Sequence, residues 1–339
     1  MREDGRVVSF RRTCAALSVA ALASVWSAIC ATEVAAEPVS NLSGIEVEGD
    51  RTVVLHVYSA AMDRVVPLRV RTPADTSVPR PTLYLLNGAG GGEGKATWDA
   101  RTDIDEFFAD KNVNVVTPLD GSFTYYTDWE RDDPALGRNK WTTFLTQELP
   151  PIVDETFGTT GVNAIAGLSM SGTSVLSLAI EEPSLYEAVG AYSGCAETST
   201  ELGQLYVRTV VESRGEADVE NMWGPLDGPG WVANDPYVNA EKLRGIDLYI
   251  SSATGLPGPH ENLGARSVEG DPGLLLNQIV VGGVIEAAVN DCTHRLASRL
   301  DELDIPATFE FRSQGTHSWG YWQDDLHASW PMIAGSIGL

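Results

Sequence analysis

The chain has 339 residues, of which 43% are hydrophobic and 21% are charged, so it is long enough to bury a large core. Its formal net charge is −24. A surface this acidic repels polyanions, which excludes nucleic acid as an expected partner.

The first 36 residues differ in kind from the rest. Two arginines precede an apolar stretch over residues 14–31, and small residues follow up to Ala36. This order is typical of a secretory signal peptide cleaved after Ala36. A retained membrane anchor is one alternative, although the stretch is short and contains serine, and a lipid attached at Cys30 is another. We expect a secreted or cell-envelope protein with no transmembrane segment in the mature chain.

The mature chain begins with two runs of alternating hydrophobicity, residues 52–58 and 65–70. A short connection separates them, which predicts an antiparallel hairpin at one edge of a sheet. Residues 82–86 have the composition of a buried strand and lead into a glycine-rich run over residues 87–92. This run lacks the lysine and the spacing of a phosphate-binding loop.

A serine-containing turn, with the sequence Gly-Leu-Ser-Met-Ser over residues 167–171, lies in the middle of the chain. It follows the apolar residues 162–166 and precedes a helical pattern over residues 173–182. A serine on a strand-to-helix turn, with small residues two before and two after it, is typical of the nucleophile turn of α/β-hydrolases. Ser171 stands where such turns usually have glycine. The alternative is that Ser169 caps an ordinary helix.

An acid-bearing segment around Glu286 and then His317 follow this turn. The order serine, acid, histidine is that of α/β-hydrolases, whereas the chymotrypsin and subtilisin arrangements place the histidine before the serine. With Ser169 as nucleophile, the expected oxyanion donors are the backbone N–H groups of Met170 and of Ala89 in the glycine-rich run.

The remaining periodic segments alternate between strand and helix. Strands are predicted at residues 113–116, 186–193, 246–250 and 307–311, and helices at residues 103–111, 141–153, 274–303 and 322–334. Residues 197–240 are irregular and rich in Gly, Pro and Trp, which indicates a cap-like insertion. The pattern predicts an α/β-hydrolase fold: a mostly parallel sheet with helices on both faces, in a single domain over residues 37–339.

Cys195 and Cys292 are the cysteines that remain once the signal peptide is removed. In an exported protein they predict one disulfide, which would hold the segment that carries Glu286 against the core. Two separate buried thiols are the alternative. The histidines and cysteines do not have the spacing of a metal site, so we expect neither a metal nor a cofactor.

A series of motifs, in order over residues 80–330, resembles the mycolyltransferases of the antigen 85 type. The most specific blocks are KWTTFLTQELP at residues 140–150 and GTHSW at residues 315–319. Shorter matches lie at residues 85–88, 125–129, 167–170, 192–194, 222–225 and 234–236.

The resemblance implies acyl transfer through an acyl-serine intermediate. On the matching positions, Ser169 is the nucleophile, His317 the general base and Glu286 the acid. Three rival acids also lie between the serine and the histidine: Glu269, Asp271 and Asp291. The family moves a mycolic acyl chain from trehalose monomycolate to trehalose or to cell-wall arabinan. The resemblance therefore implies a glycolipid or acyl-ester substrate and a sugar acceptor as partners, with loose association with the envelope.

Several positions depart from the family in ways that bear on sugar specificity. Asn87 stands where the family usually has an aspartate that helps to bind trehalose, and Gly90 stands where it has an arginine. Residues 132–137 replace the family's cysteine pair. The other candidates for substrate contact are Trp98, Trp129, Glu197, Ser318 and Trp319.

Two further functions compete with acyl transfer to a sugar. A carboxylesterase would use the same three residues with water as acceptor, and the sequence separates the two poorly. A non-catalytic envelope or matrix-binding protein is the third hypothesis. It is disfavoured because such relatives lose residues of the triad, whereas this chain retains all three.

Overall fold

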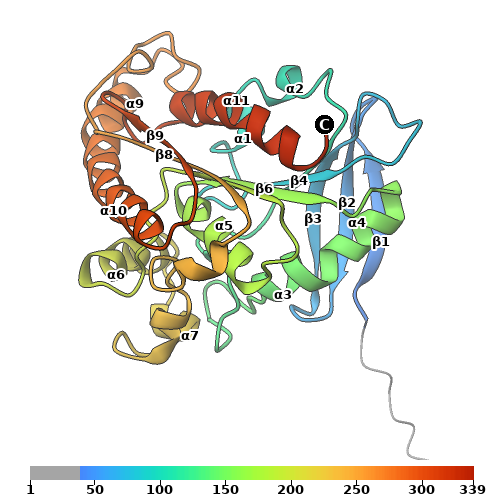
Figure 1. The fold of residues 1–339 in the computed structure, drawn as a ribbon, viewed down its shortest axis with the longest axis horizontal. Coiled ribbons are helices and arrows are strands. Elements are labelled where there is room, and N and C mark those ends of the chain that lie inside the picture. Colours follow the sequence, from blue (N-terminus) through green and yellow to red (C-terminus); the bar gives the residue numbers. More distant parts are fainter. Residues whose placement is uncertain (1–38) are drawn as a thin grey trace, which may run out of the picture. The chain divides into compact units, whose positions relative to one another are not determined.

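A computed structural model describes residues 39–339, which belong to one compact unit. The signal-peptide prediction for residues 1–36 lies outside the described residues. The central element is a nine-stranded sheet in the order β1-β2-β3-β5-β4-β6-β7-β8-β9 (Figure 1).

Three antiparallel strands form one side of this sheet: β1 (Asn41–Val47), β2 (Thr52–Ser59) and β3 (Arg64–Arg71). The predicted hairpin is confirmed by the pairing of β2 with β3, but its predicted place at the edge is wrong because β1 covers β2. The hydrophobic pattern did not reveal β1, since most of its side chains are exposed.

The other six strands are parallel, which confirms the predicted sheet: β4 (Thr82–Leu86), β5 (Asn114–Pro118), β6 (Asn163–Leu168), β7 (Ala188–Tyr192), β8 (Asp247–Ala253) and β9 (Thr308–Arg312). Strands β4 to β7 are buried along their whole length. In β4, Leu83 and Leu85 face one apolar core, and Tyr84 and Leu86 face the other.

Helices cover both faces of the sheet, as the predicted fold requires (Figure 1). One face is covered by α4 (Leu149–Phe157) and α5 (Met170–Glu181), and the other by α1 (Trp98–Arg101) and α11 (Trp319–Ser336). The helix predicted at residues 103–111 is shorter than expected, because α2 comprises only Ile104–Phe107. The helix predicted at residues 141–153 is longer, because α3 (Trp141–Thr143) continues through a π turn into α4.

Residues 197–240, which join β7 to β8, contain four helical pieces: α6 (Glu201–Arg208), a π turn (Thr209–Arg214), α7 (Val219–Trp223) and α8 (Pro229–Ala233). Trp223 and Trp231 pack edge to face in this segment, with ring centroids 5.1 Å apart. Both side chains belong to the main apolar core, so the tryptophans of this segment pack it against the rest of the domain.

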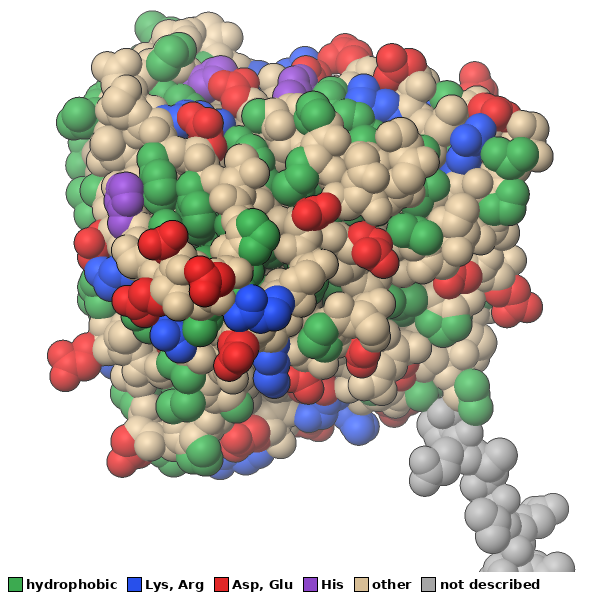
Figure 2. All heavy atoms as spheres, in the orientation of Figure 1, with side chains coloured by type: hydrophobic (Ala, Val, Ile, Leu, Met, Phe, Trp, Pro, Cys, Tyr) green, Lys and Arg blue, Asp and Glu red, His purple; other side chains and the backbone are tan. Residues whose placement is uncertain are grey.

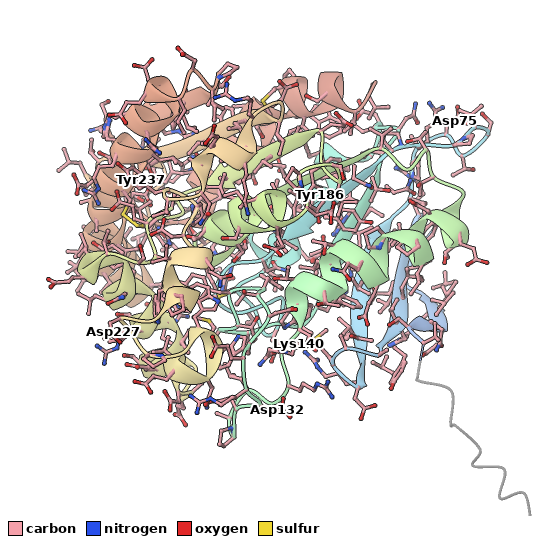
Figure 3. All side chains as sticks on the ribbon, turned by 60° about the horizontal axis from the view of Figure 1, so that its bottom comes forward. Asp75, Asp132, Lys140, Tyr186, Asp227 and Tyr237 are labelled. Atoms are coloured by element: carbon pink, nitrogen blue, oxygen red, sulfur yellow. A yellow bond between two sulfur atoms is a disulfide. The ribbon has the colours of Figure 1, made fainter. Side chains whose placement is uncertain are left out.

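The loop over residues 132–137 is held by hydrogen bonds. Asp133 is buried, and its carboxylate accepts N–H groups from Ala135 and Leu136 within the loop. It also accepts from the backbone of Asp218 and the side chain of Asn221, which lie at the start of α7. Figure 3 shows the labelled Asp132 on the outside of this loop. One buried carboxylate thus links the loop to the 197–240 segment.

A long helical segment precedes β9: α9 (Pro272–Asn277), a π turn (Gln278–Gly282) and α10 (Gly283–Glu302). It confirms the helix predicted at residues 274–303. Cys292 of α10 forms a disulfide with Cys195, which follows β7, and this confirms the predicted bridge. The bond closes a loop with a sequence separation of 97 residues and ties α10 to the end of β7.

We expect the double variant Cys195→Ser/Cys292→Ser to lose ~2–4 kcal/mol of unfolding free energy, because the unfolded chain regains the freedom that the loop removes. Urea denaturation followed by circular dichroism measures this. Reductant should bring the wild type to the midpoint of the double variant and leave the variant unchanged. Equal midpoints for the oxidised wild type and the variant would contradict a stabilising role.

Candidate active site

Ser169 occupies a strained turn between β6 and α5. Its backbone dihedrals are φ +56° and ψ −121°, a conformation that residues other than glycine rarely adopt. The turn is tight, since a Cβ on Gly167 would lie 2.5 Å from Oγ of Ser171. The N–H of Ser169 donates to the carbonyl of Tyr192 over 2.8 Å. The serine hydroxyl is thus presented beyond the carboxyl end of the sheet, as the sequence pattern predicts.

Ser171, which replaces the usual glycine, is integrated into this turn by its hydroxyl group. Oγ accepts the N–H of Leu168 over 2.9 Å, and its one proton is shared between two carbonyl acceptors, Leu168 at 3.0 Å and Leu86 at 3.2 Å. Leu168 ends β6 and Leu86 ends β4. The additional hydroxymethyl group therefore joins two neighbouring strand ends.

Ser169, His317 and Glu286 form a continuous hydrogen-bonded chain. Nε2 of His317 lies 2.8 Å from Oγ of Ser169, and its Nδ1 lies 2.8 Å from Oε2 of Glu286. A carboxylate at Nδ1 favours the tautomer with hydrogen on Nδ1, which leaves Nε2 free to accept the serine proton. The arrangement has the geometry of a nucleophile, a general base and an orienting acid.

Glu286 is 1% exposed, and its second carboxylate oxygen, Oε1, accepts two hydrogen bonds. Oε1 accepts a hydrogen bond from the hydroxyl of Ser193 over 2.9 Å and from the N–H of Ala253 over 2.8 Å. These donors compensate the loss of water around a buried charge. The sequence analysis assigned no role to Ser193, which follows β7 with φ +49°.

The three rival acids have other partners. Glu269 pairs with Arg101, Asp271 caps the start of α9, and Asp291 pairs with Arg295. Of the acids proposed from the sequence, Glu286 is the one that contacts His317.

The predicted oxyanion donors lie on two segments next to Ser169. Met170 is the first residue of α5, so its N–H has no carbonyl four residues earlier within the helix. Ala89 belongs to the turn after β4, which is closed by a hydrogen bond from the N–H of Gly91 to the carbonyl of Gly88. A Cβ on Gly88 would lie 2.8 Å from Leu168 and 3.6 Å from the Cβ of Ser169. The glycine therefore allows this turn to approach the serine.

An apolar cavity of about 140 Å³ opens beside Ser169 and His317. Residues from α5, the 197–240 segment and α10 line it, including Met170, Thr173, Tyr206, Val207, Val210, Ile285 and Val289. Burial raises the pKa of Tyr125, which also lines the cavity, so its hydroxyl stays protonated. An apolar cavity at a nucleophile suits the hydrocarbon part of an acyl group.

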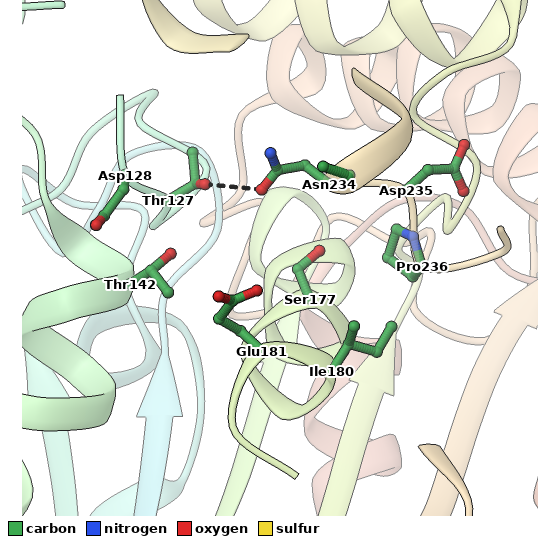
Figure 4. Close-up of a pocket in the computed structure, with 10 residues that line it drawn as sticks. Thr127, Asp128, Thr142, Ser177, Ile180, Glu181, Asn234, Asp235 and Pro236 are labelled. Carbon is green, nitrogen blue, oxygen red and sulfur yellow. Dashed lines mark hydrogen bonds between the residues drawn. The ribbon is translucent and has the colours of Figure 1, made fainter. Parts of the chain in front are cut away.

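A second cavity of about 270 Å³ lies at the other end of α5 (Figure 4). Thr127, Ser177, Glu181 and Asn234 are among its lining residues, and none of the three residues of the hydrogen-bonded chain lines it. It is larger than the apolar cavity, but none of the serine or threonine hydroxyls that line it is hydrogen-bonded to a histidine, so the chemistry points to the smaller one.

Three of the proposed substrate contacts are buried groups with partners inside the protein. The side chain of Asn87 bonds to the backbone of Pro118 and Trp98. Trp129 is 1% exposed and donates to the carbonyl of Thr124. Trp98 is fully buried in the core.

The other proposed contacts also lie outside the apolar cavity. Glu197 is buried and pairs with Arg295 over 2.6 Å. Ser318 is the buried N-cap residue of α11, and Trp319 packs against Trp98 and Trp322. Gly90 lies in the turn after β4, where its carbonyl accepts the hydroxyl of Ser122. These residues have partners within the protein instead of facing the cavity.

Glu261, which the sequence analysis did not identify, holds the loop that carries His317. Its carboxylate accepts hydrogen bonds from Thr316 and Tyr321, both over 2.6 Å, and from Gln278 over 2.8 Å. Burial alone would raise the pKa of Glu261, but these bonds and one from the N–H of Gly258 lower it below its usual value. One carboxylate thus connects the histidine loop to the helical segment that carries Glu286.

Within residues 39–339, no group of three His, Cys, Asp or Glu side chains is arranged to hold a metal ion. Two of the four other histidines have these local contacts: His260 pairs with Asp324, which raises its pKa against the effect of burial, and His294 stacks on Phe311.

Comparison with known proteins shows to which family this chain is similar. The family described as "Putative esterase" matches residues 59–333. The diacylglycerol acyltransferase/mycolyltransferase Ag85A of Mycobacterium leprae is 32% identical over 291 residues, covering 84% of this chain and 83% of the relative. Ag85B of Mycobacterium avium is 30% identical over 293 residues, covering 84% and 83%. The crystal structure of Mycobacterium tuberculosis MPT51 aligns with a TM-score of 0.69 and 25% identity, covering 84% of this chain and 97% of that one.

We expect Glu261→Gln to lower kcat for a soluble p-nitrophenyl ester ~10-fold with little change in KM, because an amide cannot accept from all four donors and His317 loses its support. Glu261→Asp should recover part of the loss. Steady-state kinetics measure both. Glu269→Gln, on the same loop, is the matched control and should behave as the wild type. Equal kcat for Glu261→Gln and the wild type would show that the hydrogen bonds of the Glu261 carboxylate are not required for catalysis.

Proposed function

Because the chain belongs to this esterase family and is a protein of the antigen 85 type, we propose that it is a serine acyltransferase. In this proposal it moves a mycolic (long-chain) acyl group from trehalose monomycolate to trehalose or to cell-wall arabinan. The observation that carries the proposal is the hydrogen-bonded chain from Ser169 through His317 to Glu286 at an apolar cavity.

The first half-reaction forms the acyl-enzyme. Oγ of Ser169 attacks the ester carbonyl of the donor while Nε2 of His317 takes the hydroxyl proton. The negative charge on the carbonyl oxygen faces the N–H groups of Met170 and Ala89. When the intermediate collapses, the bond to the sugar oxygen breaks, and His317 returns the proton to that oxygen. Glu286 stabilises the charged imidazole throughout.

The second half-reaction repeats these steps with the acceptor. His317 takes the proton of a sugar hydroxyl, whose oxygen attacks the acyl-serine carbonyl, and Ser169 leaves with the proton returned to it. The acyl chain occupies the apolar cavity in both halves. The names of the relatives, diacylglycerol acyltransferase/mycolyltransferase, support a lipid-derived acyl group as the transferred unit.

A carboxylesterase is the second candidate function. Water would then attack the acyl-serine, with the same three residues in the same roles. The match to an esterase family favours this alternative as well as the first. A purely non-catalytic binding protein is less well supported, since the described residues hold a nucleophile, a base and an acid in hydrogen-bonding contact.

We also propose that the protein works outside the cytoplasm, either released or held loosely at the envelope. The Cys195–Cys292 disulfide supports an oxidising compartment. The arginine-led apolar stretch within residues 1–36 supports export through a signal peptide.

The first test is mass spectrometry of the protein incubated with trehalose monomycolate, with and without free trehalose. We expect an acyl adduct on Ser169 that trehalose discharges to the dimycolate, because the acceptor hydroxyl completes the second half-reaction. Ser169→Ala should fold as the wild type and form no adduct. An adduct that yields only free acid would make the protein an esterase, and an adduct on Ser169→Ala would sink the nucleophile assignment.

We expect Glu286→Gln to lower kcat by roughly 10³–10⁴-fold, because an amide at Nδ1 favours the wrong tautomer of His317. The same ester assay measures this, with thermal unfolding to check that the variant is folded. Glu269→Gln is again the matched control. A Glu286→Gln enzyme within a few-fold of the wild type would remove Glu286 from the mechanism.

A further inference from the structure

The helical segment that carries Glu286 exposes a continuous set of apolar side chains. These six residues, here called the apolar face, are Leu274, Leu276, Val280, Val281, Val284 and Ile285. Val284 is 71% exposed and Leu276 is 62% exposed. The opposite side of the same segment is buried and bears Gln278, Glu286 and Val289. The segment is therefore amphipathic in an unusual sense: its charged residue points inward.

Charge is almost absent from this stretch. Residues 272–290 contain one ionisable side chain, Glu286, in a chain with 47 acidic and 23 basic residues. Exposed apolar side chains on soluble proteins normally occur singly among charged ones, and larger apolar patches mark interaction sites. Figure 2 shows hydrophobic side chains at the left edge of the molecule, where Figure 1 places α9 and α10.

Residues 272–302 form one helix that, among the described residues, is long and apolar enough to cross a membrane. It is nevertheless fixed to the domain, because Glu286 bonds to Ser193, Ala253 and His317, and Cys292 is bridged to Cys195. Only its outer side is available. A helix with one free apolar side suits an interface instead of a span.

The apolar face is continuous with the apolar cavity. Ile285 lines the cavity next to Val289 and is itself 42% exposed, so it belongs to both surfaces. The cavity, at about 140 Å³, is small beside the ~300–1,000 Å³ of typical ligand pockets. A long acyl chain attached to Ser169 therefore extends beyond the cavity, and Ile285 leads it onto the apolar face.

We propose that the apolar face docks on a neutral lipid layer. In the docked protein, the opening of the cavity lies against the lipid. The inference rests on the proposed function only for the nature of the acyl donor. Burial of apolar surface drives the docking, since the strongly acidic chain is repelled by anionic headgroups. Binding of this kind is not weakened by salt, unlike binding through basic residues.

The test is flotation of the protein with phosphatidylcholine vesicles. Val280→Ser/Val284→Ser removes apolar area without adding charge and should weaken partitioning at least ~10-fold. Val47→Ser/Val65→Ser, with valines 75% and 44% exposed on β1 and β3, is the matched control and should float as the wild type. Raising NaCl to about 0.5 M should not release the wild type.

Activity is measured on two substrates. Val280→Ser/Val284→Ser should hydrolyse a soluble p-nitrophenyl ester at the wild-type rate, which shows that it is folded. Its rate on a donor embedded in vesicles should fall with its partitioning. Equal rates of the variant and the wild type on embedded donor would overturn delivery of the cavity to the lipid.

Three other outcomes would overturn the proposal. One is equal flotation of the two double variants. Another is flotation that requires residues 1–36, which would assign the binding to the N-terminal apolar stretch. The third is a wild-type dimer in solution that Val280→Ser/Val284→Ser converts to a monomer, because a second copy would then cover the face. Ser169→Ala should float as the wild type, so failure of catalysis and failure of docking are distinguishable.

Discussion

The strained backbone at Ser169 is the constraint on which the rest of the site depends. A non-glycine residue in such a conformation costs of order 1–3 kcal/mol and persists only where its surroundings fix it. Here the N–H of Ser169 is bonded to Tyr192, and Gly172 packs so closely on Gly194 that a Cβ on Gly194 would lie 2.3 Å from it. The contact that fixes the serine turn therefore also fixes the end of β7. Ser193 lies within that contact and donates to Glu286.

A second constraint follows from placing a charge in the core. Glu286 is buried, and a buried carboxylate is tolerated only with donors on both oxygens. Its donors come from the ends of β7 and β8 and from the histidine loop. Helix α10 must therefore lie with Glu286 facing inward. Glu261, through Gln278, and the disulfide hold it in this position. The apolar face on its outer side is the geometric consequence.

The sequence predicted those features that depend on local pattern or chain order. Buried strands such as β4 and β6 are apolar after their first residue, and two cysteines outside the predicted signal peptide leave one pairing. The sequence did not reveal the residues whose role depends on contacts between segments that are distant in the chain. Glu261 resembles any loop acid until the fold places Thr316 and Tyr321 beside it. Asn87 was assigned to substrate because the resembled family has an aspartate at that position, and Trp129 because aromatic residues can line an acyl groove. Their burial and backbone partners became visible only in the fold.

In the proposed mechanism, the choice between transfer and hydrolysis is decided by which acceptor reaches the acyl-serine first. The triad geometry treats a sugar hydroxyl and water alike, and water is far more concentrated in solution. An enzyme that releases its acyl group to a sugar must therefore limit access of water at the second half-reaction. The cavity covers only part of a long chain, so the remainder of the chain needs an apolar surface to lie on. Ile285 connects the cavity to such a surface. With that surface against lipid, as proposed, the mouth of the cavity would face the lipid layer instead of bulk water, which would favour transfer by position and not by a change in the catalytic residues.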